Sequence, residues 1–209
     1  MGNYKKYTVN GLILAAGLSR RMGEFKPLMN FGKKTLIECT VDSMLSAGVS
    51  QVVVVLGYRG KEVEEVLKSQ YGNQVILVYN NKYEFTDMLF SIKCGLTVMP
   101  NCHSYFLLPG DMPLVKKTTF KVLLDAIPSN YPAILFPSLF GYSKHPPLIN
   151  SYFTQSILDF NEEGGLRQLW NKLEDFTIRV PVEDEGVGID FDTKQVYIDY
   201  INSSAFLGR

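Results

Sequence analysis

The sequence predicts one α/β domain built on a doubly wound, mostly parallel sheet. Apolar runs of strand length alternate along the chain with segments whose apolar residues recur at helical spacing. Several of these runs are continuous and β-branched, which is typical of strands covered on both faces. The composition agrees, because 46% hydrophobic and 20% charged side chains over 209 residues are ordinary for a globular domain.

Five apolar runs are the predicted strands: residues 9–14, 52–56, 75–79, 105–108 and 133–136. Four segments of helical period lie among them: residues 36–45, 63–67, 89–99 and 120–127. Gly48 and Gly72 follow the first two helical segments and are expected to end them. Strands and helices that alternate in this way form right-handed βαβ units, which place the strands in parallel.

The last third of the chain is less regular, because Pro132, Pro137, Pro146 and Pro147 interrupt it. Short strands and loops are therefore expected there. Two apolar helical faces follow, within residues 166–173 and 196–201, and Asp192 or Thr193 is expected to cap the second. The sequence contains no internal repeat, low-complexity tract or linker, so we expect one domain over residues 1–209.

Charge and composition exclude several classes of protein. The 21 basic and 21 acidic residues balance, which argues against a nucleic-acid-binding protein that relies on bulk positive charge. No apolar run is long enough to span a bilayer, and the N-terminus lacks the apolar core of a secretory signal. Cys39, Cys94 and Cys102 are widely spaced and odd in number, as reduced structural thiols are. We therefore expect a cytoplasmic protein that does not act at a membrane.

The segment most informative about function follows the first predicted strand. A loop there is bounded by two glycines and carries three cations: Gly17, Gly23, Arg20, Arg21 and Lys26. Glycines let backbone N–H groups approach a ligand, and cations beside them favour a polyanion such as a nucleoside triphosphate. Five residues separate the two glycines and no Lys-Ser or Lys-Thr follows, so this is not a Walker A loop. The dinucleotide-binding glycine pattern is also absent.

Acidic residues are expected at the same end of the sheet, because ligands of open parallel sheets bind beyond the carboxyl ends of the strands. Asp111, in Pro109-Gly-Asp-Met-Pro113, follows another predicted strand and can hold Mg²⁺ there; otherwise it caps a helix beginning near Lys116. Asp190 and Asp192 alternate, so an extended chain would direct them to opposite faces. One of them could then reach the metal while the other caps the last helix.

These motifs resemble those of the MobA-like nucleotidyltransferases, a family that includes the molybdenum cofactor cytidylyl- and guanylyltransferases. Leu14-Ala-Ala-Gly-Leu-Ser-Arg-Arg-Met-Gly23, followed by Lys26-Pro27, is similar to the opening motif of the family, Pro109–Pro113 to its metal motif and Asp190-Phe-Asp-Thr193 to its C-terminal motif. Gly164-Gly-Leu-Arg167 and His145-Pro146 are weaker matches. The resemblance implies the Rossmann-like fold of nucleotide-diphospho-sugar transferases, with a nucleotide-binding half of about residues 1–115 and an acceptor-binding half of about residues 116–209.

The resemblance also implies a reaction, namely transfer of a nucleoside monophosphate from a nucleoside triphosphate to a phosphorylated acceptor, with Mg²⁺ as cofactor and release of pyrophosphate. Its nucleotide-binding residues would be Leu14, Ala15, Ala16, Gly17, Ser19, Arg21, Gly23 and Lys26. Arg21 would bind the β- and γ-phosphates and Lys26 would lie by the α-phosphate. Asp111 and Asp190 would hold the metal, with Asp192 as the alternative second ligand.

The motifs indicate the substrates less clearly than they indicate the reaction. Ala15-Ala16 resembles the cytidylyl branch and Asp111-Met-Pro113 the guanylyl branch; the first element lies nearer the base, so CTP is favoured over GTP. Candidate acceptor-binding residues are Asn81, Ser91, His145 and Arg167, although Thr86-Asp87-Met88 and Lys144 stand where the family usually has glycine. Molybdenum-bearing molybdopterin is the favoured acceptor, and a sugar or alcohol phosphate is the alternative. A different possibility is a non-catalytic protein that carries nucleotide or cofactor to a molybdenum hydroxylase apoprotein.

Overall fold

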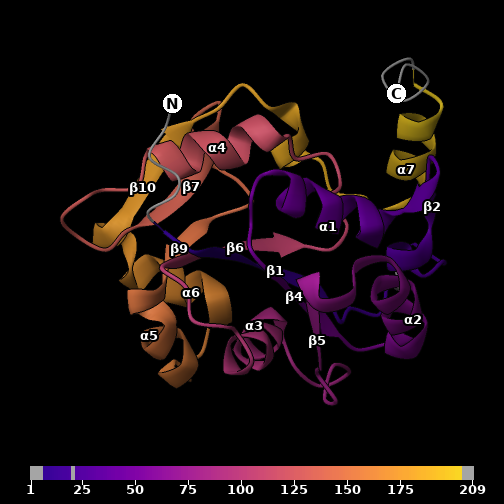
Figure 1. The fold of residues 1–209 in the computed structure, drawn as a ribbon, viewed down its shortest axis with the longest axis horizontal. Coiled ribbons are helices and arrows are strands. Elements are labelled where there is room, and N and C mark those ends of the chain that lie inside the picture. Colours follow the sequence, from indigo (N-terminus) through magenta and orange to yellow (C-terminus); the bar gives the residue numbers. More distant parts are fainter. Residues whose placement is uncertain (1–6, 20–21, 204–209) are drawn as a thin grey trace.

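A computed structural model of the chain describes residues 7–19 and 22–203. One sheet runs through the molecule with helices on both of its faces (Figure 1). Its strands lie in the order β10-β7-β9-β6-β1-β4-β5, with β8 paired to β7. They are β1 (Val9–Ala15), β4 (Val52–Leu56), β5 (Val75–Tyr79), β6 (Ser104–Pro109), β7 (Ile134–Leu139), β8 (Tyr142–Ser143), β9 (Leu148–Asn150) and β10 (Thr177–Pro181). Within this sheet, as far as the structure describes it, only the pairings of β8 and β9 are antiparallel, which confirms the predicted mostly parallel α/β fold.

Seven α-helices belong to the described residues: α1 (Leu36–Ser46), α2 (Gly60–Tyr71), α3 (Met88–Thr97), α4 (Lys117–Asp125), α5 (Thr154–Asp159), α6 (Gly165–Lys172) and α7 (Lys194–Ile201). Gly48 and Gly72 follow α1 and α2 with φ of 92° and 50°, a conformation that suits glycine and ends a helix. The sequence reading missed α5, β10 and the small hairpin of β2 (Asn30–Phe31) and β3 (Lys34–Thr35). These elements are too short or too polar to show a clear period.

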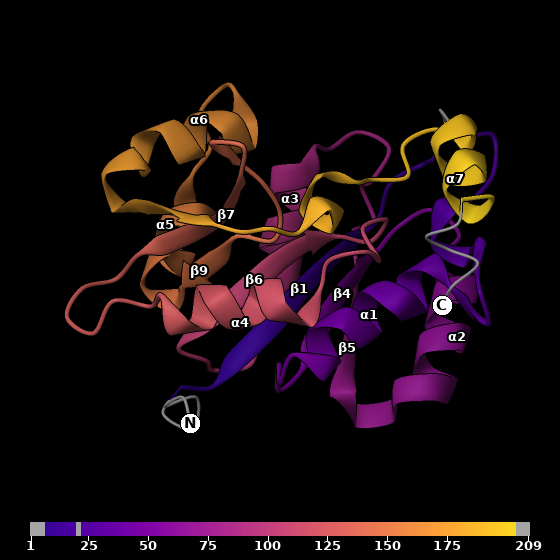
Figure 2. The same cartoon turned by 90° about the horizontal axis from the view of Figure 1, so that it is seen from above.

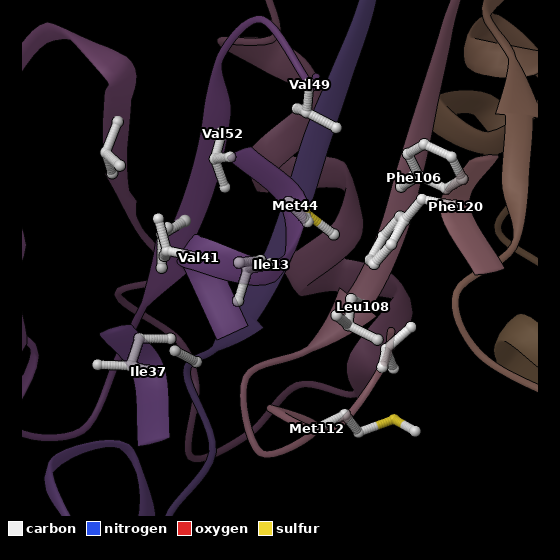
Figure 3. Packing of buried hydrophobic residues seen from close by; sticks show 14 of the residues in the cluster. Ile13, Ile37, Val41, Met44, Val49, Val52, Phe106, Leu108, Met112 and Phe120 are labelled. Atoms are coloured by element: carbon white, nitrogen blue, oxygen red, sulfur yellow. The ribbon is translucent and has the colours of Figure 1, made fainter. Parts of the chain in front are cut away.

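The two faces of the sheet pack against different helices, because successive residues of a strand point to opposite sides. On one face, Ile13 and Leu108 contribute to a core shared with α1, α2 and α4 (Figure 3). On the other face, Leu12 and Tyr105 belong to a core shared with α3, α5 and α6. The central strands are therefore fully enclosed, and their carboxyl ends are held rigidly by packing.

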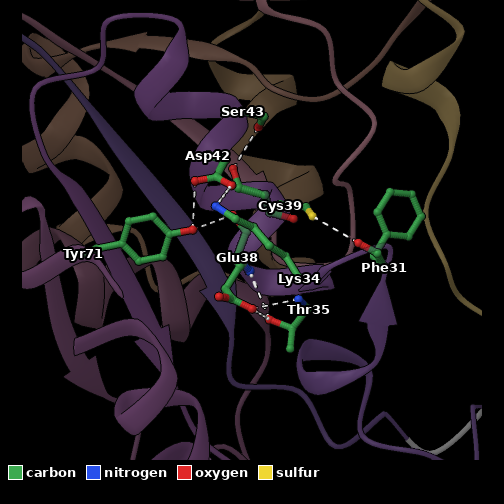
Figure 4. Close-up of polar contacts among 9 residues, drawn as sticks. Phe31, Lys34, Thr35, Glu38, Cys39, Asp42, Ser43 and Tyr71 are labelled. Carbon is green, nitrogen blue, oxygen red and sulfur yellow. Dashed lines mark hydrogen bonds and ion pairs between the residues drawn. The ribbon is translucent and has the colours of Figure 1, made fainter. Parts of the chain in front are cut away.

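A polar network holds the start of α1 in place, just after the glycine-bounded loop (Figure 4). Thr35 Oγ1 accepts from the N–H of Glu38, whose carboxylate accepts from the N–H of Thr35, which forms a capping box. Lys34 pairs with Asp42 at 2.6 Å, and the Tyr71 hydroxyl donates to Asp42 at 2.9 Å. Burial and this hydrogen bond raise the pKa of Tyr71 above its ordinary value. The network thus ties α2 and the β2–β3 hairpin to α1.

The chain that follows β10 runs across the molecule to α7 at the other end (Figure 2). We call residues 182–193 the crossing segment; it includes a short 3₁₀ helix, η6 (Glu185–Gly188). Because β10 is parallel to β7, the crossing segment begins at the carboxyl edge of the sheet. No helix of the described residues has the length and apolar character needed to cross a membrane.

Candidate functional site

A cavity of about 460 Å³ opens at the carboxyl ends of β1 and β6. Its walls come from three segments: residues 14–19 with Lys26 and Pro27, residues 109–111, and Tyr83 with the start of α3. The backbones are close together beneath it, since the N–H of Gly110 donates to the Leu14 carbonyl at 2.9 Å. A Cβ on Gly57 would lie 2.5 Å from the Ala16 carbonyl oxygen, so only glycine is accommodated there. The predicted placement of the loop and Asp111 on one edge is confirmed.

The loop that follows β1 is held in shape by its own serine. Ser19 adopts a positive φ of 51°, and its hydroxyl accepts from the N–H of Lys26 at 3.3 Å. Gly23, also at positive φ, lines a second cavity of about 650 Å³ rather than the first. Arg20 and Arg21 lie outside the described residues, so the predicted phosphate-binding role of Arg21 stays a prediction.

Lys26 joins three distant parts of the chain at the edge of the first cavity. Its Nζ donates to Asp111 Oδ2 at 2.9 Å and to Asp192 Oδ1 at 2.8 Å, while its side chain is only 11% exposed. Burial alone would lower the pKa of Lys26, but the hydrogen bonds and charges of Asp192 and Asp111 outweigh it and raise that pKa. Lys26 is therefore a fixed ammonium group between two carboxylates.

Asp190 adds a third carboxylate to this group. Partial loss of hydration raises its pKa, and the charges of Asp192 and Asp111 raise it further, while Lys26 opposes the change. Three carboxylates and one ammonium leave a formal charge of −2, which a divalent cation would balance. No three His, Cys, Asp or Glu side chains of the described residues already form a metal-binding cluster. Mg²⁺ fits nevertheless, because it needs only one or two carboxylates when substrate phosphates and water complete its shell.

Comparison with known proteins shows the family to which the chain belongs. The MobA-like NTP transferase domain matches residues 11–176 of the chain. The chain belongs to the MobA-like NTP transferase family. It is 27% identical over 192 residues to a molybdenum cofactor cytidylyltransferase of Escherichia coli K12, covering 91% of this chain and 94% of that protein.

Solved structures share the fold of this MobA-like transferase. A nucleotidyl transferase from Methanothermobacter thermautotroptrophicus superposes with a TM-score of 0.80 at 23% identity, covering 99% of both chains. A Mycobacterium tuberculosis H37Rv protein solved in complex with manganese superposes with a TM-score of 0.69 at 21% identity, covering 94% of this chain and 98% of that one. These structures confirm the Rossmann-like fold that the sequence predicted, while the family match gives the class of the protein, nucleotidyltransferase.

The roles of Asp190 and Asp192 in this MobA-like transferase differ in one respect from those predicted from the sequence. Neither Asp190 nor Asp192 caps the last helix, because Thr193 does so by accepting from the N–H of Val196 at 3.4 Å. The segment around Asp190 and Asp192 is not a strand, so their side chains need not point to opposite faces. Both carboxylates lie near Asp111. The expectation that Asp190 or Asp192 caps this helix was wrong, whereas Thr193, the other cap expected from the sequence, is confirmed.

Asp111 does not cap α4 either, since the N-cap residue of α4 is Lys116, whose N–H is bound by Asp184. Asp184 is 3% exposed and accepts from the N–H of Lys116 at 2.8 Å, Thr119 Oγ1 at 2.6 Å and the N–H of Gly186 at 2.9 Å. It fastens the crossing segment to α4 and so fixes the approach of Asp190 and Asp192 to Lys26. Nothing in the sequence indicates this role of Asp184, because the acidic residues around it show no pattern.

The four predicted acceptor residues of the MobA-like transferase are dispersed. Ser91 is buried and lines the first cavity opposite residues 14–17, and its hydroxyl accepts from Asn80 Nδ2 at 3.0 Å. Asn81 is exposed and does not line that cavity, and neither does the exposed Arg167 on α6. His145 lies between β6 and β7, with Nδ1 3.5 Å from the Leu107 carbonyl. Burial lowers the pKa of His145, although the Leu107 carbonyl and the charge of Asp111 oppose the change.

Proposed function

We propose that this MobA-like transferase moves cytidine monophosphate from CTP to the phosphate of molybdenum-bearing molybdopterin and releases pyrophosphate. The observation that carries the proposal is the joining of Lys26, Asp111 and Asp192 at the edge of the cavity formed by residues 14–19. The similarity to a molybdenum cofactor cytidylyltransferase over 91% of the chain supports the choice of substrates.

The cavity suits the nucleoside of the donor. The backbone of Leu14, Ala15, Ala16 and Gly17 forms one wall and Ser91 lies in the opposite wall. Ser91 accepts a hydrogen bond from Asn80, so its own hydroxyl proton can be donated to an acceptor atom of the base. We therefore assign Ser91 to the nucleotide rather than to the phosphorylated acceptor.

Mg²⁺ would be held by Asp111 and Asp190, and when bound it would neutralise charge on the phosphates of the donor. Asp190 is the suitable second ligand because, besides partial loss of hydration, the charges of Asp192 and Asp111 raise its pKa, and a bound cation would offset those charges. Asp192 would instead keep its ion pair with Lys26. The manganese complex of a structural relative agrees with a divalent cation in this fold.

The chain's own residues then position and stabilise the reacting groups. An oxygen of the acceptor phosphate attacks the α-phosphorus, the bond to the β-phosphate oxygen breaks, and pyrophosphate carries the electron pair away. Lys26, near the α-phosphate, would stabilise charge on its oxygens, and Arg21 would bind the departing phosphates. The acceptor phosphate is already an anion, so no general base and no covalent enzyme intermediate are required.

The test is a pyrophosphate-release screen that crosses the four NTPs with phosphorylated acceptors in the presence of Mg²⁺. We expect release with CTP and molybdenum-bearing molybdopterin, and none from a Lys26→Ala variant. Turnover of only a sugar or alcohol phosphate would overturn the acceptor and retain the reaction. Nucleotide binding with no release for any acceptor would favour a carrier that serves a molybdenum hydroxylase apoprotein.

A further inference from the structure

The sheet opens between the carboxyl ends of β6 and β7, beside the proposed reaction site. β9 pairs with β6 only as far as Phe106 and with β7 only as far as Leu135. Beyond these points residues 144–147 fill the gap. The N–H of Leu107 donates to the Pro147 carbonyl at 3.0 Å, and the N–H of Lys144 donates to the Pro137 carbonyl at 2.8 Å. Lys144 thus enters the gap from the side of β7, while Asp111 follows the end of β6.

The hairpin that leads into this gap carries an exposed aromatic residue in an unfavourable backbone conformation. Phe140 and Gly141 form the turn between β7 and β8 with φ of 52° and 82°, and Phe140 is 85% exposed. A non-glycine residue is disfavoured in this region, and such turns ordinarily use Asn, Asp or Gly. The ring is exposed, so its burial does not compensate for this conformation.

One face of this hairpin carries an aromatic ring and a cation side by side. Leu139 pairs with Tyr142 in register, and Lys144 is two residues further, so the three side chains share a face. That face is directed at η6: atoms of Leu139 and Lys144 both lie 3.9 Å from where a Cβ of Gly188 would be. Gly188 is two residues before Asp190, so Lys144 lies near the proposed metal ligands.

Lys144 also has no partner of its own among the charged residues. It forms no ion pair with any residue in the described part of the chain, whereas Lys26 is committed to two carboxylates. Tyr142 beside it is 72% exposed. A phosphate dianion approaching Asp190 and Asp192 would be repelled unless a cation accompanied it. Lys144 is placed to be that cation.

We propose that Lys144 binds the acceptor phosphate and that Tyr142 packs against a ring that carries this phosphate. The acceptor class is therefore a phosphomonoester attached to a flat or apolar group. The location of the phosphate relative to the donor rests on the proposed function, whereas the binding of a phosphomonoester to this face does not.

The test titrates two probes, phenyl phosphate and methyl phosphate, into the full-length protein and follows binding by NMR. Mg²⁺ and a non-hydrolysable CTP analogue are present to fill the donor cavity. We expect phenyl phosphate to bind more tightly than methyl phosphate. Lys144→Met should weaken both about tenfold, the effect of one charge-assisted contact, and Lys144→Arg should retain binding. Tyr142→Ala should weaken phenyl phosphate about threefold to tenfold and leave methyl phosphate unchanged.

Lys33→Met is the matched control, because Lys33 is exposed in the turn between β2 and β3 and lines neither large cavity. Wild-type affinity in Lys144→Met, or no binding of phenyl phosphate to the wild type, would overturn the proposal. A parallel Lys26→Met variant separates it from the proposed function: that variant should bind the CTP analogue poorly and phenyl phosphate normally. If the wild type fails to bind the CTP analogue, the donor assignment fails, while the titration without nucleotide still tests Lys144.

Discussion

Lys26 Nζ and Asp111 Oδ2 lie 2.9 Å apart, although 85 positions separate the two residues in the sequence. One residue belongs to the loop after β1 and the other follows β6, and these strands are neighbours in the sheet. The ion pair therefore connects the proposed phosphate-binding loop to the proposed metal site. Because of this ion pair, Lys26 can act at both proposed sites, which a surface lysine nearby cannot.

We expect Lys26→Met to lower the rate of pyrophosphate release about 10²- to 10³-fold, the usual effect of removing one preorganised charge-stabilising group. The measurement is the rate at saturating CTP and acceptor, with Lys33→Met as the control that keeps its activity. A Lys26→Met enzyme with the wild-type rate would remove this lysine from the mechanism.

The carboxylates near Lys26 should differ in their contribution to metal binding. We expect Asp111→Asn and Asp190→Asn each to weaken Mn²⁺ binding about tenfold or more, because each would remove a charged ligand. Asp192→Asn should weaken it less, because in the proposed assignment Asp192 binds Lys26 and is not a ligand of the metal. Electron paramagnetic resonance of free Mn²⁺ in the presence of CTP measures the three affinities. A larger loss in Asp192→Asn than in Asp190→Asn would reverse the assignment of the second ligand.

Asp184 is expected to matter for stability rather than for chemistry. Asp184→Ala would leave the buried N–H of Gly186, the N–H of Lys116 and the hydroxyl of Thr119 without their acceptor. We expect a loss of about 2–4 kcal/mol in the free energy of unfolding, from several unsatisfied polar groups. Urea unfolding measures it, and Asp175→Ala, at an exposed position, should change stability little. Equal midpoints for the two variants would contradict this role.

The sequence predicted the fold and the placement of the loop and Asp111 on one edge of the sheet, because both depend on local patterns. β-branched runs such as residues 52–56 indicate buried strands, and strand ends place the loop and Asp111 on one edge. The contact of Lys26 with Asp192 spans 166 positions and has no local pattern, so only the folded chain reveals it. The same reason explains why the sequence did not indicate the role of Asp184.

His145 should titrate below the usual range for histidine, because burial lowers its pKa. The folded protein then binds fewer protons than the unfolded chain once the pH falls below about 6.5. The stability that His145 contributes is thus present above pH 6.5 and is lost as the pH falls below it. We expect an NMR titration midpoint below 6.5 and, in His145→Gln, a smaller loss of unfolding free energy between pH 7 and pH 5.5. A midpoint at or above 6.5 would contradict the burial argument.

Ser91 provides the sharpest distinction between donor and acceptor binding. Its hydroxyl accepts a hydrogen bond from Asn80 and lies in the cavity with residues 14–17. Removing this hydroxyl should therefore weaken binding of the nucleotide base. We expect Ser91→Ala to raise the KM for CTP about tenfold, the cost of one lost hydrogen bond in a buried site, and to leave the acceptor KM unchanged. Lys144→Met should show the opposite pattern. A Ser91→Ala enzyme with an altered acceptor KM and an unaltered CTP KM would return Ser91 to the acceptor site, because a purely structural defect would change both constants together.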